Sequence, residues 1–258
     1  MTSTMRFGIC GHPITHTLSP RLFAAAYPQS DYSYELLPAS NPEKAIRLFI
    51  ENGFTGINVT SPLKTSIVPL IHRKTPQCTA IGACNLILKQ EDTLVAHNTD
   101  YIGVAQSLTE AKISVKNTIC LLLGAGGAAK AAAYTLLQSG ATLLWANRTP
   151  AHIPNPFHGH TPIILPFEEV ANHLPACATI INTLPQPIPD TQNLRFTSKQ
   201  TILDASYSSR PLEQQARLAG ARYICGTRWL LYQAIPSFTA MTGIAPNIRN
   251  METCLYPN

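Results

Sequence analysis

Lys64 and Asp100 are the residues of this sequence best suited to moving a proton. Lys64 ends the stretch "GINVTSPLK" (residues 56–64), and Asp100 ends "HNTD" (residues 97–100). A lysine ammonium oriented by a carboxylate can donate a proton to a reacting carbonyl oxygen, or accept it in the reverse reaction. A structural salt bridge would explain the same two residue types equally well. Both interpretations therefore stand at this point.

Hydroxyl and amide side chains recur in the same part of the chain. Taken singly, each is more often a cap or a turn residue: Ser19 before Pro20 suits a helix N-cap, and Asp100 suits the cap of a helix that begins at Tyr101. Several of these residues follow expected strands, and ligands of open α/β sheets bind beyond the carboxyl ends of strands. As a group they indicate a site for a small polyhydroxy acid. The group comprises Thr17, Ser19, Asn58, Thr60, Asn85, Asn98 and Thr99.

A glycine cluster lies between an apolar strand and an alanine-rich helix in "LLLGAGGAAKAA" (residues 121–132). It fits the pattern G-x-G-x-x-G/A, in which Gly124 permits a tight turn and Gly126 lets the backbone approach a pyrophosphate. The helix N-terminus supplies unpaired N–H groups for the same anion. The cluster therefore predicts a dinucleotide site formed by Gly124, Ala125, Gly126, Gly127, Ala128 and Ala129.

The strand after this helix, "TLLWA", ends in Asn147-Arg148-Thr149. An NAD-binding fold usually has an Asp or Glu at this position to hold the ribose 2′-hydroxyl. None is present here, and the planar guanidinium of Arg148 suits a 2′-phosphate instead. The alternative is an ordinary solvated arginine in a turn. The position after the strand favours NADP.

Strands and helices alternate along the chain, which predicts an α/β fold with mostly parallel sheets and helices on both faces. Asn41 is expected to cap a helix over 42–52, and residues 84–100 are expected to form a hairpin that turns at Glu91-Asp92. Residues 150–166 are expected to form a proline-rich loop. Further strands are expected at 6–10, 32–38, 56–59, 119–123, 142–146, 179–184, 201–206 and 222–226, and further helices at 19–27, 63–72, 101–112, 127–138, 167–174, 211–220, 228–243 and 245–256.

Composition excludes several classes of protein. The 258 residues suffice for two domains, and 45% hydrophobic with 13% charged residues is typical of a folded chain. The net charge of +5 comes from dispersed basic residues, so no nucleic-acid-binding arm is expected. The seven cysteines form no C-x-x-C pair, and no residue spacing suggests a metal site. No signal peptide is visible, and glycines and Lys130 interrupt the apolar run 119–137. A cytoplasmic protein with no membrane or nucleic-acid partner is expected.

Read together, nine stretches of this chain resemble the shikimate dehydrogenase family. They are "GHPITHTLSP", "GINVTSPLK", "IGACNLI", "HNTDYIG", "GAGGAAKA", "NRT", "INT", "DASY" and "YQAIPSFTAMTG". The resemblance implies a substrate domain at 1–101 plus 234–258 and a Rossmann-type, doubly wound NADP-binding domain at 102–233. It implies the reversible NADPH-dependent reduction of 3-dehydroshikimate to shikimate, in the biosynthesis of chorismate and aromatic amino acids. It also implies a small-molecule substrate and a monomer or homodimer.

The resemblance further assigns roles to individual residues. Lys64 and Asp100 would be the catalytic pair, which favours the catalytic interpretation over the salt bridge. Thr17 and Ser19 would bind the substrate carboxylate. The ring hydroxyls would be held by Asn58, Thr60, Asn85 and Gln233, with Tyr207 nearby. Gly124 to Ala129 would hold the pyrophosphate, and Asn147, Arg148 and Thr149 the adenosine phosphate. Thr183, Ala205 and Gly226 would line the nicotinamide side.

Some residues depart from the family pattern. Thr17 replaces a usual serine, and Phe23 a common histidine. Near the expected nicotinamide site, Cys225, Arg228 and Trp229 replace an aspartate, a glycine and a methionine, and "NRTPAH" lacks a second basic residue. These changes motivate two alternatives. One is a quinate/shikimate dehydrogenase with relaxed use of NAD and NADP, and the other is a non-catalytic sensor that binds shikimate-like ligands.

Overall fold

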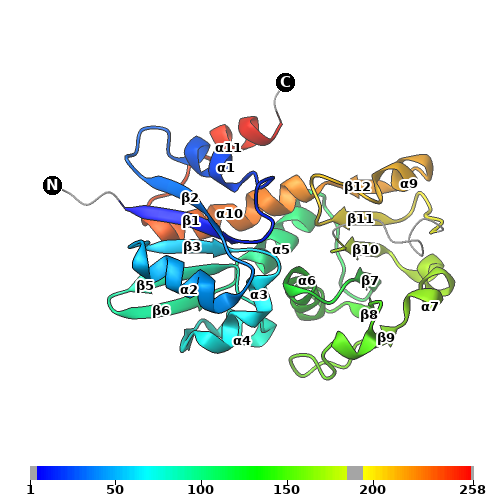
Figure 1. The fold of residues 1–258 in the computed structure, drawn as a ribbon. Helices are drawn as coiled ribbons and strands as arrows, with labels where there is room; N and C mark the ends of the chain where they lie inside the picture. The colour runs from blue at the N-terminus through cyan, green and yellow to red at the C-terminus, as the bar shows by residue number, and fades with distance from the viewer. Residues whose placement is uncertain (1–4, 185–193, 257–258) are drawn as a thin grey trace. The chain divides into compact units, whose positions relative to one another are not determined.

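The computed structural model describes residues 5–184 and 194–256, which belong to two compact units. The first unit comprises Met1–Thr99 and Gln233–Asn258, and the second comprises Asp100–Tyr232. Each described unit is built on a six-stranded sheet with helices packed against it (Figure 1). None of the helices in the described part of the chain combines the length and apolarity needed to span a membrane.

The sheet of the first unit is mixed, with strand order β2-β1-β3-β5-β6-β4. Strand β1 runs parallel to β2 and β3, while β5 is antiparallel to both β3 and β6. Gln90 faces Thr93 across the β5–β6 pair, which confirms the predicted hairpin turn at Glu91-Asp92. The strands are β1 (Arg6–Gly11), β2 (Ser33–Pro38), β3 (Gly56–Val59), β4 (Arg73–Lys74), β5 (Leu86–Gln90) and β6 (Thr93–His97).

Helices bury apolar side chains against both faces of this sheet. Phe49, Leu63 and Ile67 pack with Ile57 in one layer, whereas Phe23 and Phe238 lie against each other, with Phe23 also contacting Phe7 of β1. The helices are α1 (Ser19–Ala26), α2 (Pro42–Glu51), α3 (Leu63–Ser66), the 3-10 turn η1 (Val68–Leu70), α4 (Pro76–Ile81) and α11 (Ile248–Leu255). Helix α10 (Gly226–Thr242) begins in the second unit and ends in the first.

Two helix starts test the expected caps. The Asn41 side chain accepts a hydrogen bond from the Lys44 N–H at 2.8 Å, so the predicted N-cap of α2 is confirmed. The suggested N-cap role of Ser19 is wrong, because Ser19 is the first residue of α1 and Leu18 occupies the cap position. The Thr17 hydroxyl donates to the Ser19 hydroxyl instead.

The sheet of the second unit is entirely parallel in the described residues, with strand order β12-β11-β10-β7-β8-β9. Alternate residues of β7 face opposite layers: Leu122 packs in one core cluster and Leu121 in another. Burial on both faces is the rule for a parallel sheet covered by helices. The strands are β7 (Ile119–Leu123), β8 (Thr142–Ala146), β9 (Ile163–Leu165), β10 (Thr179–Asn182), β11 (Thr201–Asp204) and β12 (Arg222–Ile224).

The helices of this unit divide between the two layers. Helices α5 and α6 supply Val104 and Leu136 to the first layer, and α7 and α9 supply Val170 and Ala216 to the second. They span α5 (Asp100–Glu110), α6 (Gly127–Gln138), α7 (Phe167–His173) and α9 (Glu213–Leu218), with 3-10 turns η2 (Pro150–His152) and η3 (Leu174–Ala176). Edge strand β9 corrects the expected loop at 150–166. Its three residues between Pro162 and Pro166 are too few to show a strand period.

Candidate active site

Four loops of the first unit meet at one edge of its sheet. Strands β1 and β3 are parallel, and β6 runs in the same direction because β5 is antiparallel to both β3 and β6. The carboxyl ends of β1, β3 and β6 and the amino end of β5 therefore share an edge. Figure 1 places α3 directly after β3 at this edge. The sequence candidates of this unit follow or precede these strand ends, as ligand-binding residues of such sheets do.

Asn58, the third residue of β3, is buried in a network of hydrogen bonds. Its Oδ1 accepts from the Tyr34 hydroxyl at 2.8 Å. Its Nδ2 donates to the Ser237 hydroxyl at 2.7 Å and to the Asn85 backbone carbonyl at 3.1 Å. Only 6% of Asn58 is exposed. The amide is thus held in one orientation.

Asn85 joins the same edge to helix α10. Its Nδ2 donates to the Thr99 hydroxyl at 2.9 Å and to Gln233 Oε1 at 3.0 Å, and its Oδ1 accepts from the Thr99 N–H at 2.7 Å. The structure therefore brings together three predicted substrate residues, Asn58, Asn85 and Gln233. It places them with Thr99, which the sequence had also grouped with them.

The hydroxyl and lysine candidates lie on loops at this edge. The Thr17 hydroxyl donates to the Ser19 hydroxyl at 3.1 Å at the start of α1. A hydrogen bond from the His12 N–H to the Ser61 carbonyl, 3.0 Å, joins the loop after β1 to the loop after β3. Thr60 and half-buried Lys64 lie on that second loop and on α3. The Lys64 carbonyl accepts from the Cys84 N–H at 2.7 Å, which ties α3 to the segment that carries Asn85.

Asp100 begins α5 and is the first residue of the second unit, whereas Lys64 belongs to the first. The pairing of these two side chains stays a prediction. Only 3% of Asp100 is exposed. The suggested cap role of Asp100 is wrong, because α5 begins at Asp100 itself and not at Tyr101. A carboxylate at the first position of a helix is nevertheless favoured by the helix dipole.

The glycine cluster forms the turn from β7 to α6, as predicted. Gly124 has φ +104, and a Cβ there would lie 2.4 Å from the Thr183 hydroxyl. The Gly124 carbonyl accepts from the buried Trp145 indole N–H at 2.6 Å. Gly126 is the N-cap of α6, and a Cβ built on it would meet no protein atom within 4 Å. Open space in front of the helix N-terminus fits a pyrophosphate.

The end of β8 carries the predicted adenosine-side residues. The Asn147 side chain donates to the Thr149 carbonyl at 2.9 Å and closes the turn. Arg148, between them, is exposed. The structure therefore shows a structural role for Asn147, and it leaves the Arg148 guanidinium accessible for an anion.

The predicted nicotinamide-side residues lie at the carboxyl ends of the other strands. Thr183 follows β10, and its hydroxyl donates to the Leu123 carbonyl at 2.6 Å. A Cβ on Gly226 would lie 2.5 Å from the Ala205 carbonyl oxygen and 2.7 Å from that of Asp204. Glycine at 226 thus allows the start of α10 to pack against the end of β11.

Asp204 organises the loop that carries Ala205 and Tyr207. Its carboxylate is fully buried and accepts from the Ser206 and Leu212 N–H groups, the Asn182 amide and the Tyr223 hydroxyl. Burial raises the pKa of Asp204 above its ordinary value, although these four donors oppose the shift. The motif "DASY" contains Asp204, but its sequence alone gave no signal of this role.

Two departures from the family pattern have structural explanations. Trp229 is 4% exposed and packs in the core with Leu108, and a Cβ on Gly103 would lie 2.5 Å from its ring. Arg228 forms an ion pair with Glu110 at 3.2 Å. Both side chains therefore have structural partners within the second unit.

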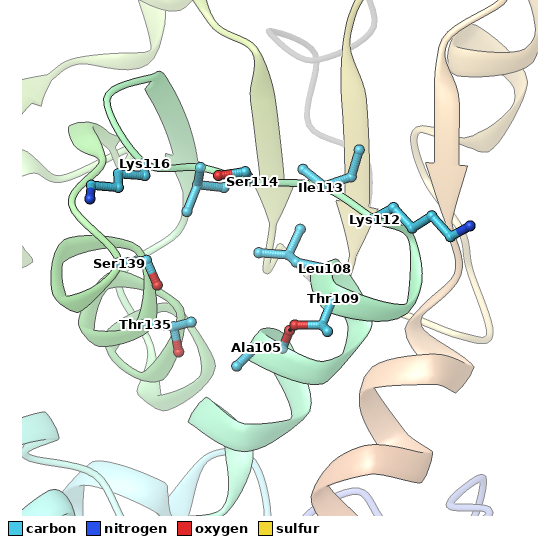
Figure 2. A pocket seen from close by; sticks show the side chains of 10 residues that line it. Ala105, Leu108, Thr109, Lys112, Ile113, Ser114, Lys116, Thr135 and Ser139 are labelled. Atoms are coloured by element: carbon cyan, nitrogen blue, oxygen red, sulfur yellow. Dashed lines mark hydrogen bonds between the residues drawn. The ribbon is translucent and has the colours of Figure 1, made fainter.

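A pocket of about 420 Å³ lies between α5 and α6 (Figure 2). Segment 113–116, which leads into β7, and Ser139, just after α6, line it, so it lies at the opposite end of β7 from the glycine turn. Figure 2 shows Lys112 and Lys116 pointing away from it. The hydroxyls of Thr109 and Thr135 bond to backbone carbonyls. This pocket is separate from the glycine turn between β7 and α6, and we assign no function to it.

Sequence reasoning missed two members of the amide network. Ser237 lies one helical turn after Gln233, so an i, i+4 comparison could have identified it. Tyr34 has no such local signal. No cluster of three or more metal-ligating side chains of the kinds His, Cys, Asp and Glu occurs among the residues that the structure describes.

Comparison with known proteins identifies the family. Residues 9–87 match the family described as "Shikimate dehydrogenase substrate binding domain". The chain is 34% identical to the shikimate dehydrogenase (NADP(+)) of Anaeromyxobacter dehalogenans, over 98% of this chain and 96% of that protein. The corresponding enzyme of Carboxydothermus hydrogenoformans is 32% identical, over 96% and 95%. The crystal structure of shikimate 5-dehydrogenase from Thermus thermophilus in complex with NADP(H) and shikimate superposes with a TM-score of 0.81 at 28% identity, covering 98% of both chains. With such identity over nearly its whole length, this chain belongs to the shikimate dehydrogenase family.

Proposed function

We propose that this chain catalyses the reversible NADPH-dependent reduction of 3-dehydroshikimate to shikimate, a step in the biosynthesis of aromatic amino acids. The observation that carries the proposal is the network of Asn58, Asn85 and Gln233 at the carboxyl edge of the first sheet. Two buried amides and the half-buried Gln233, in the same unit as the hydroxyls of Thr17 and Ser19, suit a ligand with several hydroxyl groups and a carboxylate.

Each unit would bind one of the two ligands. The first unit, Met1–Thr99 with Gln233–Asn258, would bind shikimate, and the second, Asp100–Tyr232, would bind NADP; these bounds differ from the expected domains by one or two residues. The open space at Gly126 and the exposed Arg148 support NADP binding by the second unit. Gly124 to Ala129 would hold the pyrophosphate, and Arg148, positioned by the Asn147–Thr149 turn, would contact the 2′-phosphate. Thr183, Ala205 and Gly226 would face the nicotinamide, which supplies the hydride when NADPH is bound.

Lys64 would donate the proton. In the direction of reduction, its ammonium donates to the ring carbonyl oxygen as the hydride arrives at the carbon, and in the reverse direction the lysine amine accepts the hydroxyl proton. Asp100 would hold the ammonium in position. Thr17 and Ser19 would bind the substrate carboxylate, while Asn58, Thr60, Asn85, Gln233 and Tyr207 would hold the ring.

The test is the initial rate of NADP reduction with shikimate for the wild type and Lys64→Ala. Loss of the proton donor is expected to lower kcat by about 10²- to 10⁴-fold, with little change in the KM for shikimate. Lys89→Ala, a change of an exposed lysine on β5 of the same unit, is the matched control and should leave kcat unchanged. Near-normal turnover in Lys64→Ala would refute the role of Lys64. Shikimate binding by the wild type without any turnover would favour a sensor over an enzyme.

A second candidate is a quinate/shikimate dehydrogenase that uses both NAD and NADP. The observation that favours it is the single arginine at the end of β8, because Arg148 alone must then distinguish the two cofactors. Comparable kcat/KM values with quinate, or with NAD, would support this candidate. The free thiols of all seven cysteines support a cytoplasmic location. For the oligomeric state, we propose a monomer or homodimer.

A further inference from the structure

The Asn58 side chain has few hydrogen-bonding positions left for a ligand. A carboxamide has two N–H donors and two acceptor lone pairs on oxygen. Both donors are used, one by the Asn85 backbone carbonyl and one by the Ser237 hydroxyl, and one lone pair receives the Tyr34 hydroxyl. The backbone carbonyl also fixes which end is nitrogen, because a carbonyl oxygen needs a donor. The remaining position is one lone pair on Oδ1.

The two side chains that complete this arrangement are themselves firmly held. The ring of Tyr34 stacks on Phe23 at 4.7 Å and 29°, and it meets the edge of Phe238 at 5.9 Å and 68°. Phe238 is the next residue after Ser237 on α10, and Ser237 is fully buried. The aromatic contacts therefore place the Tyr34 hydroxyl and the Ser237 hydroxyl on the same amide from two elements far apart in the sequence.

We propose that Tyr34 and Ser237 are positioning residues that make Asn58 an acceptor for a substrate hydroxyl. This proposal rests on the proposed function, in which Asn58 contacts the ring of shikimate. Tyr34 directs its hydrogen to Oδ1, and Ser237 accepts from Nδ2, so the amide cannot rotate to offer a donor. The atom presented to the ligand is therefore Oδ1, which accepts a hydrogen bond from a donor group of the ligand.

The hydrogen-bonding positions of the Asn85 side chain are occupied in a similar way. Its two N–H donors go to Thr99 and Gln233, and one lone pair of Oδ1 receives the Thr99 N–H. Two neighbouring amides thus present acceptors. A ligand with hydroxyl groups at both positions can donate to them, whereas a carbonyl or ether oxygen at either position would face an oxygen without a hydrogen between them. This edge of the sheet should therefore select ligands that present hydroxyl donors to Asn58 and Asn85.

The test compares Tyr34→Phe and Ser237→Ala with the wild type in shikimate oxidation by NADP. Phenylalanine keeps the ring stack and removes the hydroxyl alone. Each variant is expected to raise the KM for shikimate about fivefold to tenfold, the range for one lost orienting hydrogen bond, with the KM for NADP unchanged and kcat little affected. The control is Tyr32→Phe, a tyrosine of the same aromatic cluster that contacts Phe7 and Phe23. It should leave all three constants unchanged.

Monodeoxy analogues of shikimate that keep the reacting hydroxyl decide whether Tyr34 acts through Asn58. For the analogue that lacks the hydroxyl bound by Asn58, the ratio of KM values between Tyr34→Phe and wild type should fall to about one. A ratio that stays equally high for every analogue overturns the proposal, as does a general loss of kcat in Tyr34→Phe with no rise in KM.

Failure of the proposed function gives a different result. If the wild type does not oxidise shikimate, that function is refuted, and the positioning role is judged from hydrogen exchange of the Asn58 side-chain amide by NMR. Faster exchange in Tyr34→Phe and Ser237→Ala than in Tyr32→Phe supports the positioning of Asn58. Equal exchange in all three variants overturns it.

Discussion

Two glycines of the β7–α6 turn allow an effect of mutation on cofactor binding to be distinguished from an effect on folding. A Cβ on Gly126 would meet no protein atom within 4 Å, and the residue has φ −77, which alanine adopts freely. Gly124 differs in both respects, with φ +104 and the Thr183 hydroxyl 2.4 Å from a built Cβ. We therefore expect Gly126→Ala to impair NADP binding and Gly124→Ala to impair folding as well.

The magnitudes follow from these contacts. In Gly126→Ala, the smaller entropy of the unfolded chain offsets the poorer N-cap, so the free energy of unfolding should change by about 1 kcal/mol or less. The new methyl would occupy the space proposed for the pyrophosphate. Losing one or two charge-assisted hydrogen bonds to the helix N-terminus costs about 1.5–3 kcal/mol, or roughly a tenfold to hundredfold rise in Kd for NADP.

Gly124→Ala combines an unfavourable backbone conformation with overpacking against Thr183. Each effect costs about 1–3 kcal/mol, so a loss of about 2–6 kcal/mol in the free energy of unfolding is expected. The assay pairs urea unfolding, followed by circular dichroism, with calorimetric titration of NADP. Gly82→Ala, at a glycine with φ +65 and open space around its Cβ position in the first unit, is a control for backbone strain alone.

The reasoning is refuted if Gly126→Ala binds NADP as tightly as the wild type, because the open space would then not be the pyrophosphate position. It is also refuted if Gly126→Ala loses as much stability as Gly124→Ala. In that case the difference in free space around Gly124 and Gly126 would not determine the stability of the turn.

Two more predictions concern single side chains. Arg148→Gln should raise the KM for NADP about tenfold to hundredfold and leave that for NAD unchanged, because the exposed guanidinium is the proposed 2′-phosphate ligand; equal effects on both cofactors would argue against this contact. Burial lowers the pKa of His97, so the unfolded chain binds a proton more readily than the folded chain, and stability is lost as pH falls below about 6.5 toward the lowered value. Urea midpoints at acidic and neutral pH should therefore differ less in His97→Gln than in the wild type, and an equal difference would contradict the assignment.

Much of the fold could be predicted from local patterns. The family and the α/β class with a Rossmann-type unit are confirmed. Asn41 and the Glu91-Asp92 turn were also predicted correctly, because a cap and a two-residue turn depend on adjacent residues. Strand β9 and helix α4 were missed. The first has three residues, and the second has six beginning at a proline, so neither shows a usable period.

The Tyr34–Asn58 contact shows why part of the site was beyond sequence reasoning. Tyr34 lies on β2 and Asn58 on β3, with β1 between them. In the register of the sheet, Tyr34 pairs with Phe7, whereas Asn58 pairs with Ile9, so the two are neither on adjacent strands nor level with each other. The long tyrosine ring, held by Phe23, spans that distance. Predicting it would require the strand order, the register and the side-chain direction together.

Mutations in the two units are expected to affect different ligands, because the proposed ligand-binding residues are divided between the units. Apart from Asp100 and Tyr207, the proposed shikimate ligands belong to the first unit, including Gln233, which α10 carries back to it. The bonds of Asn58 and Asn85 are likewise internal to that unit. Shikimate affinity should therefore depend mainly on first-unit residues, while Arg148, Gly126 and Asp204 should affect NADP. Because the Asp204 carboxylate accepts hydrogen bonds from the loop that carries both Ala205 and Tyr207, a change there can also affect shikimate through Tyr207. A change at Arg148 or Gly126 that altered the KM for shikimate more than the KM for NADP would be inconsistent with this division.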